Sequence, residues 1–227
     1  MTRWEKKILQ IVRKINPEDP IRYVQKIVRN DARKKLDEAI RSCHKCSIAD
    51  SVKTVTFGAT DASILVLTDT ALPNHKNAYP DCDSTSWEMT VSTFKFYDIP
   101  LTDCFFMNSV NCCPYLKMEN SMIYRIPNLN EKKSCKPYLD QAIRIVQPKL
   151  IIILGNVALN SMILANINTV HGKTLDIYGI PAIATFSPEY LLWCKKENPD
   201  AYECEKNIFF ADFEKIKEEW NNVKEQS

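Results

Sequence analysis

The 227-residue chain has no long hydrophobic run, which argues against a membrane protein. Its longest strongly apolar run, LIIIL at residues 150–154, is far too short to cross a bilayer. The first ten residues, MTRWEKKILQ, also lack the uninterrupted apolar stretch of a signal peptide. We therefore expect an intracellular protein, cytoplasmic or nuclear, that is neither secreted nor associated with a membrane.

The chain is also poor in glycine, and this argues against nucleotide-binding folds. Its four glycines form neither the G-x-G-x-x-G pattern of dinucleotide sites nor a Walker motif. Gly155 precedes a predicted helix and could cradle a phosphate, but we expect it to serve helix packing instead. Internal repeats, low-complexity stretches and a linker between two domains are absent as well. The length and the 45% hydrophobic content suffice for one globular core.

Charge is distributed unevenly along the chain, although the formal net charge is only +2. Residues 1–45 hold 13 lysines and arginines against 6 acidic residues, so this segment carries a net charge of about +7. It is either a solvent-exposed helix face or the electrostatic footprint of a nucleic acid or an acidic partner. We divide the chain into a basic helical extension, residues 1–41, and one domain, residues 42–227.

Alternating strand and helix patterns predict an α/β fold. Runs typical of strands buried on both faces occupy residues 62–69, 103–110, 148–155 and 180–187. Helical patterns occupy residues 17–42, 85–98, 130–146, 156–167 and 198–220. This order favours a three-layer αβα sandwich around a mainly four-stranded parallel sheet, with a hairpin through Gly179.

Ligands of such sheets bind beyond the carboxyl ends of the strands. The segments that follow the four predicted strands are TDTALPNHKN, NSVNCCPYLK, GNVALN and SPEYLLWCKK. We expect these four segments to share one crevice.

Nine cysteines, an odd number in a chain expected to be intracellular, argue against a disulfide framework. Cys43 and Cys46 form a C-x-x-C turn, whose two thiolates can converge on one ion or cluster. Cys112 or Cys113, with Cys135, would complete four thiolates for zinc or an iron–sulfur cluster. Alternatively, these three are small apolar core residues, as free cysteines usually are.

The order of several motifs resembles the iron–sulfur branch of the uracil-DNA glycosylase superfamily, commonly called family four. The matching segments, in order, are CHKC, NSVNCCPY, SCKPYLDQAIRIVQPKLIIILGNVAL and HGKTLDIYGIPAIATFSPEYLLW. They cover roughly residues 40–195, and their order is far more specific than any single motif. The resemblance implies that family's αβα fold, single-stranded or duplex DNA as the partner, and hydrolysis of N-glycosidic bonds in DNA repair.

The resemblance also implies a [4Fe–4S] cluster held by Cys43, Cys46, Cys112 and Cys135, with zinc as the alternative metal. Cys112 occupies the family's ligand position, whereas Cys113 stands where the family has arginine. Such a cluster would tie the basic helix to two loops of the crevice, a structural rather than a redox role.

Catalytic and DNA-binding roles follow from the same resemblance. Asp69 matches the family's carboxylate, one methylene shorter than the usual glutamate, and Asn108 matches the amide that reads the flipped base. Pro188, Leu191 and Leu192 match a loop that pinches the DNA backbone and wedges a side chain into the base stack. Each has a plainer alternative: Asp69 caps a turn, Asn108 ties a strand end, and Pro188 begins a helix.

Several positions depart from the family pattern. Ser187 takes the catalytic position of the family's histidine, so the leaving-group donor has become a weaker hydroxyl. His171, which we count among the DNA-binding residues, replaces the arginine of an Arg-Gly pair, and Trp193 replaces a phosphate-facing arginine. Tyr79 is the nearest candidate for the aromatic ring that stacks on the base.

Two functions therefore stay open. One is a divergent DNA glycosylase that excises uracil or another altered pyrimidine. The other is a noncatalytic subunit of a replication or repair assembly, which uses the fold to bind DNA or a protein partner. A zinc-binding or nucleotide-binding module is a third and smaller alternative.

Overall fold

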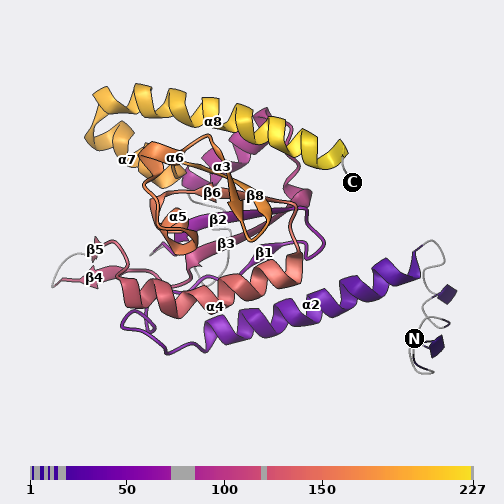
Figure 1. The fold of residues 1–227 in the computed structure, drawn as a ribbon. Coiled ribbons are helices and arrows are strands. Elements are labelled where there is room, and N and C mark those ends of the chain that lie inside the picture. Colours follow the sequence, from indigo (N-terminus) through magenta and orange to yellow (C-terminus); the bar gives the residue numbers. More distant parts are fainter. Residues whose placement is uncertain are drawn as a thin grey trace.

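The computed structural model describes residues 19–72, 85–118 and 122–225, together with residues 2, 6, 7, 10, 13 and 14. A mixed six-stranded sheet lies between two layers of helices (Figure 1), which confirms the predicted αβα sandwich. Within the described residues, no helix is both long enough and apolar enough to cross a membrane.

Four parallel strands form the centre of the sheet. They are β2 (Ile64–Thr70), β3 (Cys104–Val110), β6 (Leu150–Leu154) and β8 (Ile180–Thr185). Their spatial order is β3-β2-β6-β8, and every residue of β3 and β6 is buried. These are the four strands predicted from their runs of branched apolar residues, so that prediction is confirmed.

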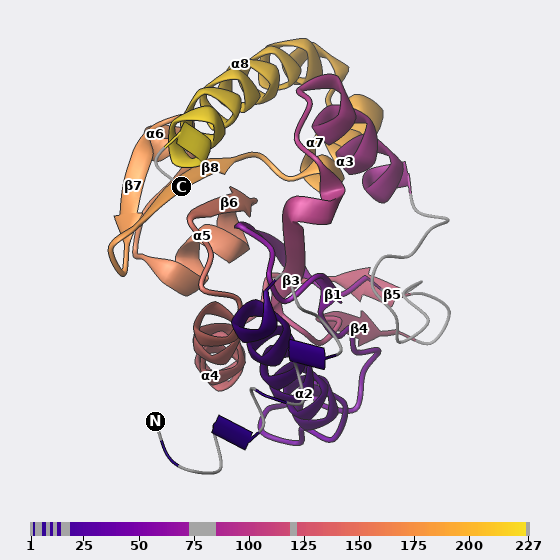
Figure 2. The ribbon, with the colours of Figure 1, turned by 90° about the vertical axis from the view of Figure 1, so that its right-hand side faces the viewer.

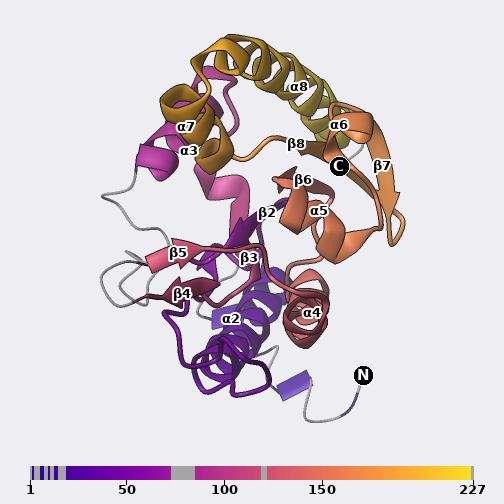
Figure 3. The ribbon, with the colours of Figure 1, turned by 90° about the vertical axis from the view of Figure 1, so that its left-hand side faces the viewer.

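Short antiparallel strands complete the sheet. The strand β1 (Phe57–Gly58) pairs with β3, and β7 (Thr174–Ile177) pairs with β8 in the predicted hairpin through Gly179. A separate hairpin of β4 (Tyr115–Lys117) and β5 (Met122–Tyr124) extends from the side of the molecule (Figure 3). Neither β1 nor this hairpin was predicted, because each strand has only two or three residues.

Helices cover both faces of the sheet (Figures 1 and 2). On one face α4 (Leu129–Val146) packs on β3, with α2 (Pro20–Arg41) outside it. On the other face lies α8 (Pro199–Glu225), beside α3 (Thr85–Phe96) and α7 (Pro188–Glu197). A 3₁₀ turn, Leu101–Asp103, leads into β3.

Two helical predictions need correction. The helix expected over residues 156–167 is two shorter helices, α5 (Asn156–Met162) and α6 (Ile167–Val170), because the backbone at Ile163 is extended. The segment SPEYLLWCKK, expected to be a loop, forms α7. Pro188 occupies the first turn of α7, which agrees with the alternative that this proline begins a helix.

The second half of α2 packs against the rest of the protein. Leu36 and Ile40 are buried in the core, and Arg33 donates to the backbone carbonyls of Thr56 and Gly58, each at 2.8 Å. The predicted division of the chain after residue 41 stays a prediction. The second half of α2, which lies before that division, contributes side chains to the core of the domain.

Several cations of the basic segment have partners within the protein. Lys26 Nζ lies 3.1 Å from a carboxylate oxygen of Asp61, and Arg29 donates to the carbonyl of Val146 at 3.3 Å. Because these groups are engaged in the fold, the charge of the segment is partly accounted for without a nucleic acid or an acidic partner.

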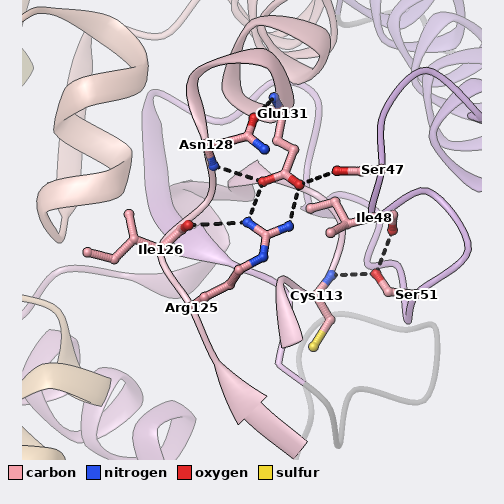
Figure 4. A network of polar contacts seen from close by, with 8 residues as sticks. All are labelled: Ser47, Ile48, Ser51, Cys113, Arg125, Ile126, Asn128 and Glu131. Carbon is pink, nitrogen blue, oxygen red and sulfur yellow. Dashed lines mark hydrogen bonds and ion pairs between the residues drawn. The ribbon is translucent and has the colours of Figure 1, made fainter. Parts of the chain in front are cut away.

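A buried carboxylate fixes the start of α4 (Figure 4). Glu131 accepts hydrogen bonds from the guanidinium of Arg125, from the backbone N–H of Asn128 at 2.8 Å and from the hydroxyl of Ser47 at 2.6 Å. The Asn128 side chain in turn accepts from the Glu131 N–H at 3.0 Å, which completes a capping box. Arg125 lowers the pKa of Glu131 to about 2.

We predict that Glu131→Gln destabilises the fold by about 2–3 kcal/mol at pH 7, because Arg125 then loses its buried counter-charge. The folded pKa lies below the unfolded one, so the stabilisation by Glu131 is complete above about pH 5 and lost as the pH falls toward 2. Urea unfolding of both proteins across this range should show the difference shrinking with acid.

Glu218→Gln is the matched control, since Glu218 pairs with Lys215 on the exposed face of α8. Its effect should stay within about 0.5 kcal/mol. A Glu131→Gln variant that is no less stable than this control would contradict the role given to the buried carboxylate.

Candidate active site

The four parallel strands share one row of paired residues near their carboxyl ends. Asn108 of β3 pairs with Thr68 of β2, Thr68 with Leu154 of β6, and Leu154 with Thr185 of β8. Each segment that follows this row therefore begins at the same edge of the sheet. Asp69 is the first residue beyond the row on β2.

A pocket of about 730 Å³ lies at this edge. Asp69, Asn108, Ser187 and Pro188 all line it, so the three predicted catalytic residues meet in one cavity. Aromatic side chains supply much of its wall. They are Trp87, Tyr115, Tyr124, Phe186, Tyr190 and Trp193. A cavity of this size, with a few polar groups among aromatic rings, suits a small planar ligand.

Asp69 sits against the amino-terminal end of α5. Its Oδ1 accepts the backbone N–H of Ala158 at 2.8 Å, and the N–H of Val157 also bonds the carboxylate. Gly155, at φ +110°, makes this approach feasible, because a Cβ there would lie 2.3 Å from either carboxylate oxygen. The absent side chain of Gly155 thus leaves room for the carboxylate of Asp69.

Burial raises the pKa of Asp69 to about 7. The N–H of Ala158 opposes this rise, the nearby carboxyl of Glu189 adds to it, and the N–H of Val157 opposes it again. A carboxylate that titrates near neutral pH is basic enough to take a proton from an attacking water. Asp69 therefore accepts hydrogen bonds from the start of a helix, where the plainer alternative expected a turn, and also has the properties of a general base.

Asn108 is held in place at both ends of its amide. The hydroxyl of Thr68 donates to its Oδ1, and its Nδ2 donates to the hydroxyl oxygen of Thr54. Among the residues that the structure describes, one N–H and one lone pair of the amide have no partner and could bind a ligand. Asn108 is 2% exposed and lines the pocket, so a rigid amide both ties the strand end and faces the cavity.

Ser187 is the N-cap of α7, and its Oγ accepts the backbone N–H of Tyr190 at 3.2 Å. Pro188, next to it, lines the pocket. Leu191 is fully buried in the core and presents no side-chain surface to solvent, whereas Leu192 is partly exposed. Contact of these residues with DNA stays a prediction. Pro188 could contact a ligand in the pocket, whereas the buried side chain of Leu191 could not without a change in the structure.

Glu189 is a second carboxyl group in the pocket and was missed by the sequence reasoning. The hydroxyls of Ser86 and Ser187 hydrogen-bond to it, and burial raises its pKa strongly enough to outweigh them. The sequence could have indicated Glu189 as a pocket residue, because it lies two residues after Ser187 in a segment already expected at the crevice.

His171 supports the pocket wall from behind. Its Nδ1 lies 3.0 Å from a carboxylate oxygen of the buried Asp212, and its ring stacks on Phe186 with 5.8 Å between ring centroids. It is not among the residues that line the pocket. Tyr79, the predicted stacking residue, lies outside the described residues.

Aromatic rings continue from the pocket to the surface along α7. Phe186 lies 5.4 Å from Tyr190, and Tyr190 stacks on Trp193 at 6.1 Å with an interplanar angle of 22°. Trp193 is 55% exposed. The residue that replaces a phosphate-facing arginine of the resembled family is therefore the outermost member of an aromatic series.

Three of the four predicted cluster cysteines lie together in a small apolar cluster. Cys46, Cys112 and Cys135 pack with Ile48, Val110 and Val157. Burial raises the pKa of Cys112 to about 12, and the thiols of Cys135, Cys46 and Cys43 add to the rise, so all four are within electrostatic reach. Thiolates are the ligands that iron–sulfur clusters use. Over residues 19–72, 85–118 and 122–225, however, no three or more His, Cys, Asp or Glu side chains form a metal-binding group.

Cys113 points away from this group. Its backbone N–H donates to the carbonyl of Val52 at 2.9 Å and to the hydroxyl of Ser51 at 3.0 Å (Figure 4). Its thiol receives the backbone N–H of Tyr115, and burial raises its pKa to about 11 with no contribution from the other cysteines. Of the adjacent pair, Cys112 is therefore the one that joins the other thiols.

One family model matches most of the chain. The family model described as the Uracil DNA glycosylase superfamily matches residues 27–212, which include every residue that lines the pocket. The match begins within α2. A comparison with curated proteins finds no match.

We predict that Asp69→Asn removes part of the pH dependence of stability. The folded pKa of about 7 lies above the ordinary 3.8, so the stability contributed by Asp69 is complete below about pH 4 and falls as the pH rises through 7. Between pH 6 and 8 the wild type should lose about 1 kcal/mol more unfolding free energy than the variant, measured by urea titration.

Asp200→Asn, a change at an exposed position of α8, is the control and should keep the wild-type pH dependence. Identical pH dependence in the wild type and Asp69→Asn would show that the carboxylate is ionised normally in the folded protein.

Proposed function

The chain belongs to the uracil DNA glycosylase superfamily, and from this premise we propose that it excises uracil or another altered pyrimidine from DNA by hydrolysing the N-glycosidic bond. One observation carries the proposal: a carboxylate with a pKa of about 7 shares a pocket with a fixed amide and aromatic rings.

In the proposed reaction, a base flipped out of the DNA enters the pocket between aromatic side chains. The free N–H and lone pair of Asn108 bond the edge of the base. As the bond between the base and the sugar breaks, the carboxylate of Asp69 stabilises the positive charge that develops on the sugar. The same carboxylate accepts a proton from the water that attacks the sugar carbon.

The aromatic series on α7 supports DNA as the ligand. Tyr190 and Trp193 present exposed rings at the mouth of the pocket, 37% and 55% exposed. Unpaired bases stack on such rings regardless of sequence, with about 1–3 kcal/mol per base. Nucleotides that flank the flipped base would bind here through stacking, where the resembled family uses an arginine on the phosphate.

The excision test uses single-stranded and duplex oligonucleotides that carry uracil or another altered pyrimidine. We predict abasic sites, detected as strand breaks after alkali, and a loss of at least about 100-fold in rate for Asp69→Ala. Asp200→Ala, far from the pocket, should retain the wild-type rate.

The noncatalytic alternative predicts a different outcome of the same experiment. Fluorescence anisotropy would then show binding of the oligonucleotides by the wild type and by Asp69→Ala, while neither protein forms abasic sites on any candidate base. That combination would replace the glycosylase proposal with a DNA-binding role for the pocket.

We also propose that Cys43, Cys46, Cys112 and Cys135 hold a [4Fe–4S] cluster. The support is that the thiols of Cys135, Cys46 and Cys43 each raise the pKa of Cys112, and that apolar residues surround three of the four cysteines. When bound, the cluster would supply a structural cross-link between the end of α2, the segment after β3, and α4. Zinc on the same thiols is the alternative metal.

The cysteine pair allows a direct test of this proposal. Protein purified without oxygen should be brown, with broad absorbance near about 400 nm and about four irons per chain. Cys112→Ser should lose the colour and the iron, whereas Cys113→Ser should keep both, because its thiol faces Tyr115. Colourless protein with one zinc per chain, or loss of iron only in Cys113→Ser, would contradict the assignment.

A further inference from the structure

We propose that Glu189 is the proton donor to the departing base, in place of the histidine that Ser187 replaces. This inference rests on the proposed glycosylase function and assigns the acid that the reaction needs. It follows from the position of Glu189 in the pocket, from the hydrogen bonds of Ser187 and from the presence of two carboxyl groups in one cavity.

Glu189 is placed by the first turn of α7. Ser187 caps this helix and Pro188 begins it, so Glu189 projects from a short rigid segment directly after β8. Both Glu189 and Asp69 line the pocket, and the two are close enough for Glu189 to raise the pKa of Asp69. The second carboxyl group is therefore supplied by the segment after β8, whereas Asp69 belongs to β2.

The hydroxyl of Ser187 is already committed. Its oxygen accepts the N–H of Tyr190 at 3.2 Å, and its single proton is donated to the carboxyl of Glu189. Ser187 is also only 3% exposed. It therefore has no proton left for a leaving base, and its bond with Glu189 orients the group that does.

The two carboxyl groups share one proton in the proposed starting state. Two backbone N–H groups at the start of α5 favour the ionised form of Asp69. Burial raises the pKa of Glu189, against the hydrogen bonds from a backbone N–H and from the hydroxyls of Ser86 and Ser187, which favour the carboxylate. Repulsion between neighbouring carboxylates favours one proton on the pair, and we place it on Glu189 because this residue lies two positions after Ser187, at the corner of the pocket where the resembled family has its histidine.

Tyr124 is the other titratable group that senses this pair. Its hydroxyl bonds Thr70, and burial, with Asp69 and Glu189 among the further causes, raises its pKa to about 12. Tyr124 is therefore neutral at physiological pH, and the proton that can move in the pocket belongs to the carboxyl pair.

In the proposed step, the bond between the sugar carbon and the base nitrogen breaks, and its electron pair leaves with the base. The carboxylic acid of Glu189 gives its proton to the base and becomes a carboxylate. Water adds to the sugar carbon, and its proton passes to the carboxylate of Asp69. Transfer of that proton back to Glu189 through solvent restores the starting state.

The test compares uracil with 5-fluorouracil in otherwise identical oligonucleotides, under single-turnover conditions. Fluorine stabilises the base anion, so a base that leaves more easily depends less on a proton donor. Glu189→Gln should slow the excision of uracil by about 100-fold or more, and the excision of 5-fluorouracil at least about tenfold less severely. Glu189→Asp, which keeps a carboxyl group, should fall between the wild type and Glu189→Gln on uracil.

Glu197→Gln, at the exposed end of the same helix, should leave both rates unchanged. Equal losses on the two bases in Glu189→Gln would overturn the proton-donor role and leave Glu189 a positioning residue of an active glycosylase. No excision of either base by the wild type would instead overturn the glycosylase function, and the role of Glu189 with it. Glu189→Asp keeps the test decisive if Glu189→Gln does not fold.

Discussion

The burial of one carboxylate is the constraint on which the candidate site depends. Asp69 lies where β2 leaves the sheet, and the N–H groups at the start of α5 hold it there. This contact requires a residue without a Cβ at Gly155 and a common row of pairing across β3, β2, β6 and β8. A shift of β2 by one residue would turn its side chains to the other face and remove the carboxylate from the pocket.

Departures from the family pattern are concentrated at one corner of this site. The carboxylate, the amide and the aromatic wall are all present, whereas the histidine position holds Ser187, which caps α7. In the proposed reaction, the fold that supplies the strand ends is therefore separable from the group that would assist the leaving base. A carboxyl group two residues further along the helix lies in the same cavity, so the proposed chemistry does not require a donor at position 187.

The sequence predicted the four parallel strands because each is buried on both faces and reads as a continuous run of branched apolar residues. It also predicted four residues of the pocket, since strand ends of a parallel sheet meet at one edge. It did not predict α7, whose ten residues bury few side chains, among them Leu191 and Cys194. Glu189 was missed because one of its hydrogen-bonding partners, Ser86, and the burial that raises its pKa both depend on the folded chain, in which Ser86 lies about a hundred positions away in sequence.

The adjacent cysteines show how backbone geometry separates two identical side chains. Cys112 pairs with Lys53 in an isolated antiparallel bridge, so the backbone there is extended and successive side chains point to opposite sides. One thiol consequently joins Cys46 and Cys135 beneath the segment after β3, and the other reaches Tyr115 in the pocket wall. Cys112 and Cys113 therefore do not face the same group of thiols. Cys112 does not line the pocket but packs with Val157, which does, so any group held by Cys112 would lie next to the pocket.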